Sequence, residues 1–71
     1  MREWLKKKRI EKGLTMAQMA SELMITESYY SLIEAGERQK KMDVVIVVRL
    51  SKALGIPITD IIIMEAAEEE K

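Results

Sequence analysis

Three glycines divide the chain into short segments, and no other feature constrains the possible folds as strongly. Gly13, Gly36 and Gly55 each follow a stretch whose apolar residues recur at helical spacing. A glycine directly after a helix commonly takes the left-handed conformation that ends the helix. The sequence has no internal repeat and no Gly/Ser-rich linker, and it ends in the run AAEEEK. We therefore expect one all-α domain over residues 1–67 and an acidic tail over 68–71.

Residues that favour the N-cap position mark the starts of three helices. Thr15, Thr26 and Asp43 can each accept a hydrogen bond from an otherwise unpaired helical amide. Gln18 stands three residues after Thr15, which is the spacing of a capping box. Together with the glycines, these caps predict five helices, at about residues 2–12, 16–23, 27–34, 44–54 and 58–67.

The connection between the second and third of these helices is very short. Only Met24 and Ile25 are available to form it before the next cap. Such a link suits a sharp corner between two helices rather than antiparallel stacking. In the third helix, Tyr30 and Ile33 share one face and the more polar positions point elsewhere. The segment 15–34 therefore predicts a helix-turn-helix.

The last two helices are rich in apolar residues. In the fourth, the run VVIVV favours a strand by propensity. A stripe at helical spacing favours a helix instead, and it comprises Val44, Val47, Val48, Ser51 and Leu54. In the fifth, the apolar residues at 61–64 exceed what one buried stripe needs. We therefore expect part of the fifth helix to meet another chain.

The charged and reactive residues bear directly on function. The chain has no cysteine and no histidine, and no nucleophile stands beside a base, so we expect neither catalysis nor a metal, a cofactor or a small-molecule ligand. The net charge of zero counts against nucleic acid as a partner. However, residues 1–41 hold nine Lys or Arg against six Asp or Glu, a net of +3, whereas 42–71 hold three against six, a net of −3. One half of the chain is basic.

The sequence predicts neither a secretory signal nor a membrane-spanning helix. The first ten residues, MREWLKKKRI, are charged throughout and lack the apolar stretch of a secretory signal. The longest apolar run has five residues, Val44 to Val48, against the roughly 20 that a membrane-spanning helix needs. We expect a soluble, cytoplasmic protein with no membrane partner.

Four segments resemble the Cro and repressor family of phage and bacterial regulators: LKKKRIEKGLT, MASELMIT, YYSLIEAGER and LSKALGIPITDII. Positions where the family's motif requires apolar or small residues hold Met19, Ala20, Leu23, Ile25, Tyr30 and Ile33. The resemblance implies a five-helix, lambda-repressor-like DNA-binding fold. It also implies a sequence-specific transcriptional repressor that binds double-stranded DNA as a homodimer, with helix 27–34 in the major groove.

The resemblance assigns base reading to the outward residues of helix 27–34. Glu27, Ser28 and Leu32 would face the bases, with Thr26 and Ser31 at the margin of the groove. Glutamate can accept from a cytosine amino group and leucine can touch a thymine methyl, but neither is a strong base reader. Glu27 could equally serve its own helix dipole, and Leu32 could be buried against a partner.

Phosphate contacts, by the same resemblance, come from the start of the second helix and from the loop after the third. These positions are Thr15, Met16, Arg38, Lys40 and Lys41. Backbone amides at a helix start suit phosphate oxygens, whereas the Met16 side chain adds no polar contact. Weaker candidates for the same role are Lys6, Lys7 and Lys8.

Structural roles follow from the resemblance for three further residues. Arg9 and Glu34 correspond to an ion pair that bridges the first and third helices. Met24 stands at a corner position where the family generally has a left-handed glycine, at a strain of about 1 kcal/mol. The corner would either bend differently or accept that strain.

A dimer interface is expected on the fifth helix. Its apolar centre would be Ile63 and Met64, with Val45 and Ile46 as further candidates. Alternatively, these residues only complete the core of the monomer. The weak base readers and the zero net charge also leave a second function open. It is a protein-binding helix-turn-helix module, such as an anti-repressor or an antitoxin-like partner.

Overall fold

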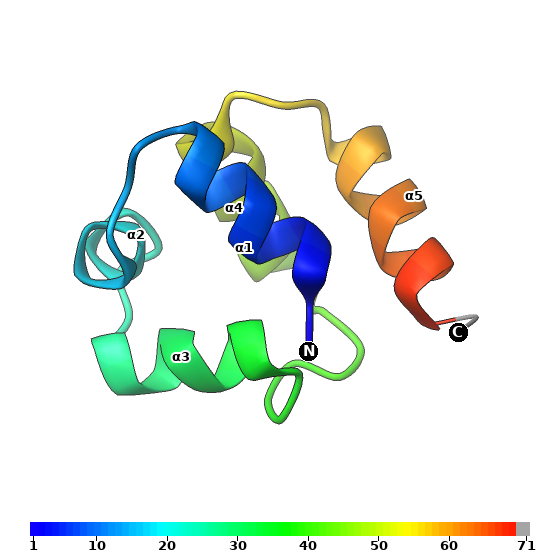
Figure 1. The fold of residues 1–71 in the computed structure, drawn as a ribbon. Coiled ribbons are helices and arrows are strands. Elements are labelled where there is room, and N and C mark those ends of the chain that lie inside the picture. Colours follow the sequence, from blue (N-terminus) through cyan, green and yellow to red (C-terminus); the bar gives the residue numbers. More distant parts are fainter. Residues whose placement is uncertain (70–71) are drawn as a thin grey trace.

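The computed structural model describes residues 1–69, and this range contains five α-helices and no strand (Figure 1). The helices are α1 (Glu3–Glu11), α2 (Met16–Glu22), α3 (Glu27–Ala35), α4 (Val44–Leu54) and α5 (Ile58–Glu69). Each of the five expected helices is present within one or two residues of its expected limits. The all-α, five-helix fold class is therefore confirmed.

Three N-caps form as the sequence predicts. Thr15 Oγ1 accepts from the Gln18 amide at 3.1 Å, and Gln18 Oε1 accepts from the Thr15 amide at 2.8 Å, which completes the capping box. Thr26 and Asp43 accept from the amides three residues on, at 3.1 and 2.8 Å. Because each cap satisfies an otherwise unpaired donor, α2, α3 and α4 begin directly after these residues.

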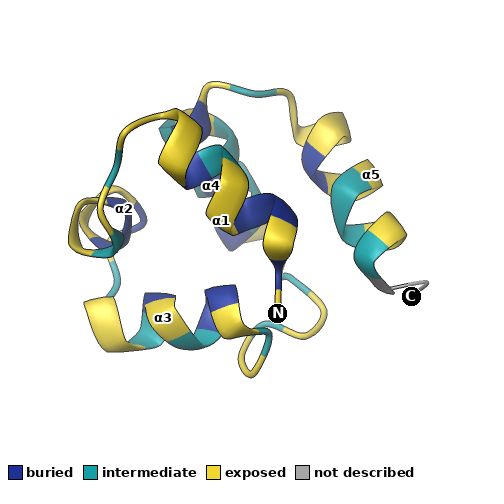
Figure 2. Ribbon diagram, in the orientation of Figure 1, coloured by how far each residue is buried: buried dark blue, intermediate teal, exposed yellow. Residues whose placement is uncertain are grey.

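The core lies where the α2–α3 pair meets the other three helices. α1 contacts α3 and α5, and α4 contacts α2 and α5. Every helix contributes at least one apolar side chain without solvent exposure: Leu5, Met19, Leu23, Tyr30, Ile33, Leu50 and Ile61. In Figure 2 the buried residues of α3 turn toward the interior, and its opposite edge is exposed. The packing therefore leaves one side of α3 open.

The buried face of α4 differs from the expected stripe. Ile46, Leu50 and Leu54 are buried, whereas Val44 is 77% exposed. The run VVIVV is apolar on every side of the helix, so its periodicity cannot select the face that turns inward. Contacts with α2 and α5 make that selection. The helical assignment is confirmed; in the expected stripe Leu54 is buried and Val47, Val48 and Ser51 are half-buried, so only Val44 was wrong.

α5 continues through Glu69, two residues beyond its expected end at 67. Glu68 Oε1 accepts a hydrogen bond from the Trp4 backbone amide at 3.0 Å, so Glu68 is held against α1 instead of starting a tail. The last two residues of the expected tail, Glu70 and Lys71, lie outside the described residues. Among helices of the described range, none has the length and apolarity needed to cross a membrane.

Candidate nucleic-acid interface

α3 has one buried face and one open face. The buried face consists of Tyr30, Ile33 and Glu34. The open face presents the exposed residues Glu27, Ser28 and Ser31, with Leu32 half-buried at its edge. Because the core holds only the first face, α3 can offer the second to a ligand without disturbing the packing.

A shallow hollow of about 460 Å³ lies between this open face and the start of α2. It is lined by Met16, Glu27, Ser28, Ser31 and Leu32. Four residues expected to read bases and one expected at a phosphate therefore lie together. Thr26 is also exposed, but its hydroxyl oxygen is engaged in capping α3.

The start of α2 offers backbone donors beside this hollow. The capping box uses the amides of Thr15 and Gln18, whereas those of Met16 and Ala17 find no acceptor within residues 1–69. Amides at a helix start are suitable donors to a phosphate oxygen. The Thr15 hydroxyl accepts from Gln18 and keeps its own proton for donation.

The direction of the open face is set by a buried ion pair between α1 and α3. Arg9 Nε lies 2.9 Å from Glu34 Oε2, and Arg9 Nη2 lies 3.2 Å from Glu34 Oε1. Tyr30 Oη donates to Glu34 Oε2 at 2.6 Å. The hydrogen bond to Glu34 raises the pKa of Arg9, and burial, together with the bond to Glu34, raises the pKa of Tyr30 well above its ordinary value. This cluster fixes how α3 is rotated against α1.

The corner between α2 and α3 contains a strained backbone conformation at Met24. Met24 has a φ of 58°, in the left-handed region that favours glycine. The Ile25 amide donates to the Ala20 carbonyl at 3.0 Å, and Ala20 itself is buried. The corner therefore keeps the left-handed conformation, with the Met24 side chain 71% exposed.

The basic residues of the loop after α3 do not line the hollow at the open face. Arg38 is exposed close to the end of α3. Lys40 and Lys41 border a separate hollow of about 250 Å³, which they share with Ile62 and Glu65 of α5. The three residues therefore belong to one loop, but Lys40 and Lys41 lie beside α5 whereas Arg38 lies near the end of α3.

Arg2 holds this loop, although no pattern in the sequence marks it as a structural residue. The residue is 5% exposed, and its guanidinium contacts the end of α3, the loop and α5. Its partners are as many as 63 positions away along the chain. An arginine beside the N-terminus is normally solvated, so no local pattern marks it.

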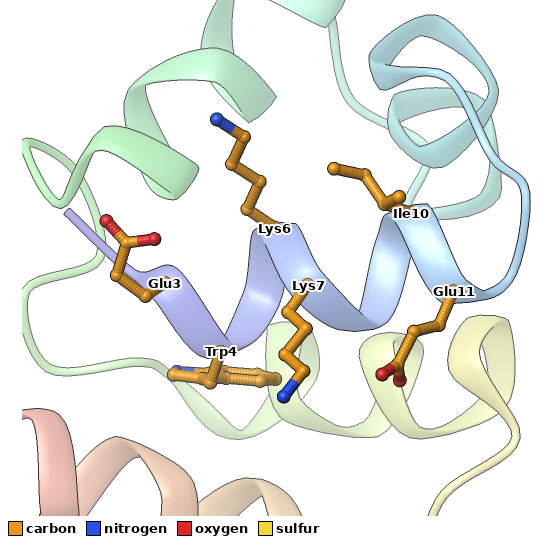
Figure 3. A pocket seen from close by; sticks show the side chains of 6 residues that line it. All are labelled: Glu3, Trp4, Lys6, Lys7, Ile10 and Glu11. Carbon is orange, nitrogen blue, oxygen red and sulfur yellow. The ribbon is translucent and has the colours of Figure 1, made fainter.

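The lysines of α1 are spread over different directions. Lys6 and Lys7 leave the helix on opposite sides, and Lys7 lies near the flat ring of Trp4 (Figure 3). They border an open hollow of about 550 Å³ that residues of α1 alone line. Lys8 Nζ lies 3.6 Å from Glu11 Oε1, in an ion pair on α1. None of the three lysines lines the hollow at the open face of α3.

The residues expected at a dimer interface fall into two groups. Ile63 is 66% exposed and its neighbour Ile62 is 56% exposed, so α5 has an open apolar side. Met64 is half-buried and packs against the core. Val45 is 54% exposed, but Ile46 is a core residue at 5%. Ile46 was therefore wrong as an interface candidate, because α4 turns this side chain inward.

Comparison with known proteins agrees with this geometry. The profile of the helix-turn-helix family matches residues 5–61, from α1 into α5. An uncharacterized HTH-type transcriptional regulator of Bacillus subtilis (strain 168), YqaF, is 42% identical over 55 residues, which cover 78% of this chain and 70% of the relative. No solved structure matches the chain.

Proposed function

The chain belongs to the Cro/repressor-type helix-turn-helix family of transcriptional regulators, and on this basis we propose that it is a sequence-specific repressor of transcription. In this proposal a homodimer binds double-stranded DNA and inserts one α3 of each copy into the major groove. Two copies related by a two-fold axis would read two half-sites about one helical turn apart.

The observation that carries the proposal is the open face of α3. Its exposed residues lie opposite the buried face, and the ion pair of Arg9 with Glu34 holds the helix in place. The major groove admits an α-helix, so this face can reach base edges there. Glu27, Ser28, Ser31 and Leu32 are the proposed readers, with Thr26 at the margin.

Phosphate contacts are proposed on both sides of α3. On one side, the free amides at the start of α2 and the Thr15 hydroxyl would bind the DNA backbone. On the other, Arg38, Lys40 and Lys41 would supply positive charge. Because glutamate, serine and leucine are weak base readers, these backbone contacts would provide most of the affinity.

The homodimer is proposed to form through the open apolar side of α5. Ile63 and Ile62 supply its exposed centre, and the partly buried Met64 connects this side of α5 to the core. An exposed cluster of this kind on a small domain is typical of an interaction site. A symmetric contact would place the two copies of α3 in a fixed relation.

One observation favours a different function. The hollow at α3 contains Met16 and Leu32 as well as the acidic Glu27, a combination that suits a protein surface better than phosphates. The second candidate is therefore a protein-binding helix-turn-helix module, such as an anti-repressor or an antitoxin-like partner.

Selection from a pool of random DNA duplexes, followed by sequencing, distinguishes the two candidates. A repressor should enrich a two-fold-symmetric site, whereas a protein-binding module should enrich no sequence. Ser31→Tyr, on the open face, should lose the enriched site because the larger side chain blocks entry into the groove. Ser21→Tyr is the matched control, since Ser21 is exposed on α2 outside the hollow. No enrichment by the unmodified protein would defeat the proposal.

A further inference from the structure

Arg2 contacts three separate parts of the molecule from a buried position at the start of α1. Its Nη1 donates to the carbonyl of Ile33 at 2.6 Å and to that of Arg38 at 3.0 Å, and its Nη2 donates to the Gln39 carbonyl. Its Nε donates to Glu65 Oε1 at 2.8 Å. All three nitrogens of the guanidinium are therefore used, and they join the end of α3, the following loop and α5.

The loop between α3 and α4 depends on such polar contacts. Residues 36–41 contain no large apolar side chain, so burial cannot fix their conformation. Gln39 has a φ of 54°, and its side chain donates to Tyr29 Oη at 2.8 Å and accepts from the Asp43 amide at 3.0 Å. Arg2 holds the same residue through its backbone carbonyl. Gln39 is thus fixed on both sides.

The arrangement requires a guanidinium. Its planar fork can direct hydrogen bonds to the α3 end, the loop and Glu65 at the same time, which a lysine ammonium cannot do. Glu65 also accepts from Trp4 Nε1 at 2.6 Å, so the carboxylate is itself held in place. With an exposed fraction of 5%, Arg2 cannot contact DNA directly.

We infer that Arg2 is a positioning residue for the phosphate contacts of the loop. It holds the backbone of Arg38 and Gln39 against the end of α3, and so sets where the cationic side chains of the loop lie relative to the open face. Through Glu65 it also ties this loop to α5, the proposed dimer helix. The inference rests on the proposed DNA-binding function.

The test is a double-mutant cycle between Arg2 and the loop charges, with a short mixed-sequence duplex as the probe. Arg2→Lys keeps the charge but loses the planar fork, and it should weaken DNA binding about tenfold. The slope of log affinity against log salt concentration should fall by about the value of one phosphate contact. In a background with Arg38, Lys40 and Lys41 replaced by Gln, Arg2→Lys should cause no further loss. An equal loss in both backgrounds would overturn the inference, because it would show a general structural effect.

Amide hydrogen exchange provides a readout that needs no DNA. In Arg2→Lys the amides of Arg38 and Asp43 should exchange about tenfold faster, whereas that of Leu23, at the end of α2, should not change. Unchanged exchange in the loop would also overturn the inference. If Arg2→Lys fails to fold, Glu65→Gln takes its place, since it keeps the acceptor oxygen and removes the charge. An unmodified protein that binds no duplex would defeat the proposed function, while loop exchange still decides whether Arg2 positions the loop.

Discussion

Arg9 on α1 and Glu34 on α3 meet through two hydrogen bonds, Nε to Oε2 at 2.9 Å and Nη2 to Oε1 at 3.2 Å. The Glu34 side chain is 1% exposed and that of Arg9 is 10% exposed, so water screens the pair weakly. Arg9 also donates to the Leu14 carbonyl at 2.9 Å, which extends the link to the loop before α2. The open face of α3 is therefore oriented by a contact outside the face itself.

Glu34→Ala should strongly destabilise the protein. The change leaves the Arg9 guanidinium buried without its carboxylate, which lowers the free energy of unfolding by about 3 kcal/mol. Thermal unfolding followed by circular dichroism measures the effect. Glu37→Ala is the control, because Glu37 is exposed and its loss should change stability by no more than about 0.5 kcal/mol. An unchanged melting temperature for Glu34→Ala would refute the bridge.

Alkaline pH should destabilise the protein through Tyr30. Burial raises the pKa of Tyr30 above its ordinary value of 10.0. The contribution of Tyr30 to the free energy of unfolding is therefore fully present below about pH 10. It is lost at higher pH, because the unfolded chain releases the phenolic proton while folded Tyr30 keeps it. Melting temperatures of the protein and of Tyr30→Phe, measured from neutral pH to about pH 11, test this. Tyr30→Phe should show the shallower decline, and equal declines would contradict the assignment.

Local signals in the sequence predict the helix limits well. The caps at Thr15, Thr26 and Asp43 act within three residues, so each can be recognised without knowing the fold. The corner and the two faces of α3 follow from the same short-range pattern. This explains why the helix-turn-helix could be identified from the sequence alone, whereas the base readers were assigned by family resemblance and stay a prediction.

Long-range contacts could not be predicted in the same way. Arg2 and Glu65 are 63 positions apart, and nothing near either residue distinguishes them from solvated charges. The acidic end of the chain was interpreted as a tail from 68 onward, yet Glu68 reaches back to α1. The inward face of α4 depends on its neighbours, because Ile46 and Val44 are equally apolar.

Met24→Gly should stabilise the protein. Glycine adopts a φ of 58° without the strain that a Cβ causes, and Met24 loses little packing because its side chain is 71% exposed. The free energy of unfolding should rise by up to about 1 kcal/mol, less the entropy that glycine adds to the unfolded chain. Met24→Ala keeps the Cβ and serves as the control. A gain in stability for both variants would show that the strain is not its source.

Glu27→Gln should change the sequence preference of the protein. Glutamine can form two hydrogen bonds with adenine, whereas glutamate accepts from cytosine. Selection from random duplexes should therefore show a change at one symmetric pair of positions. Glu22→Gln makes the same charge change on the exposed side of α2 and should leave the preference unaltered. If Glu27→Gln lowers only the melting temperature, Glu27 acts on the dipole of α3 and reads no base.

Ile63→Glu should dissociate the proposed homodimer. Ile63 is 66% exposed in the single chain, so the change leaves the fold intact, but a two-fold contact would bury one unpaired carboxylate from each copy. The dimer dissociation constant should rise at least about a hundredfold, measured by sedimentation equilibrium. Ile10→Glu is the matched control, because Ile10 is 57% exposed on a different helix, α1. If the unmodified protein sediments as a monomer at high concentration, then α5 carries no dimer interface and the half-sites are bound by separate copies.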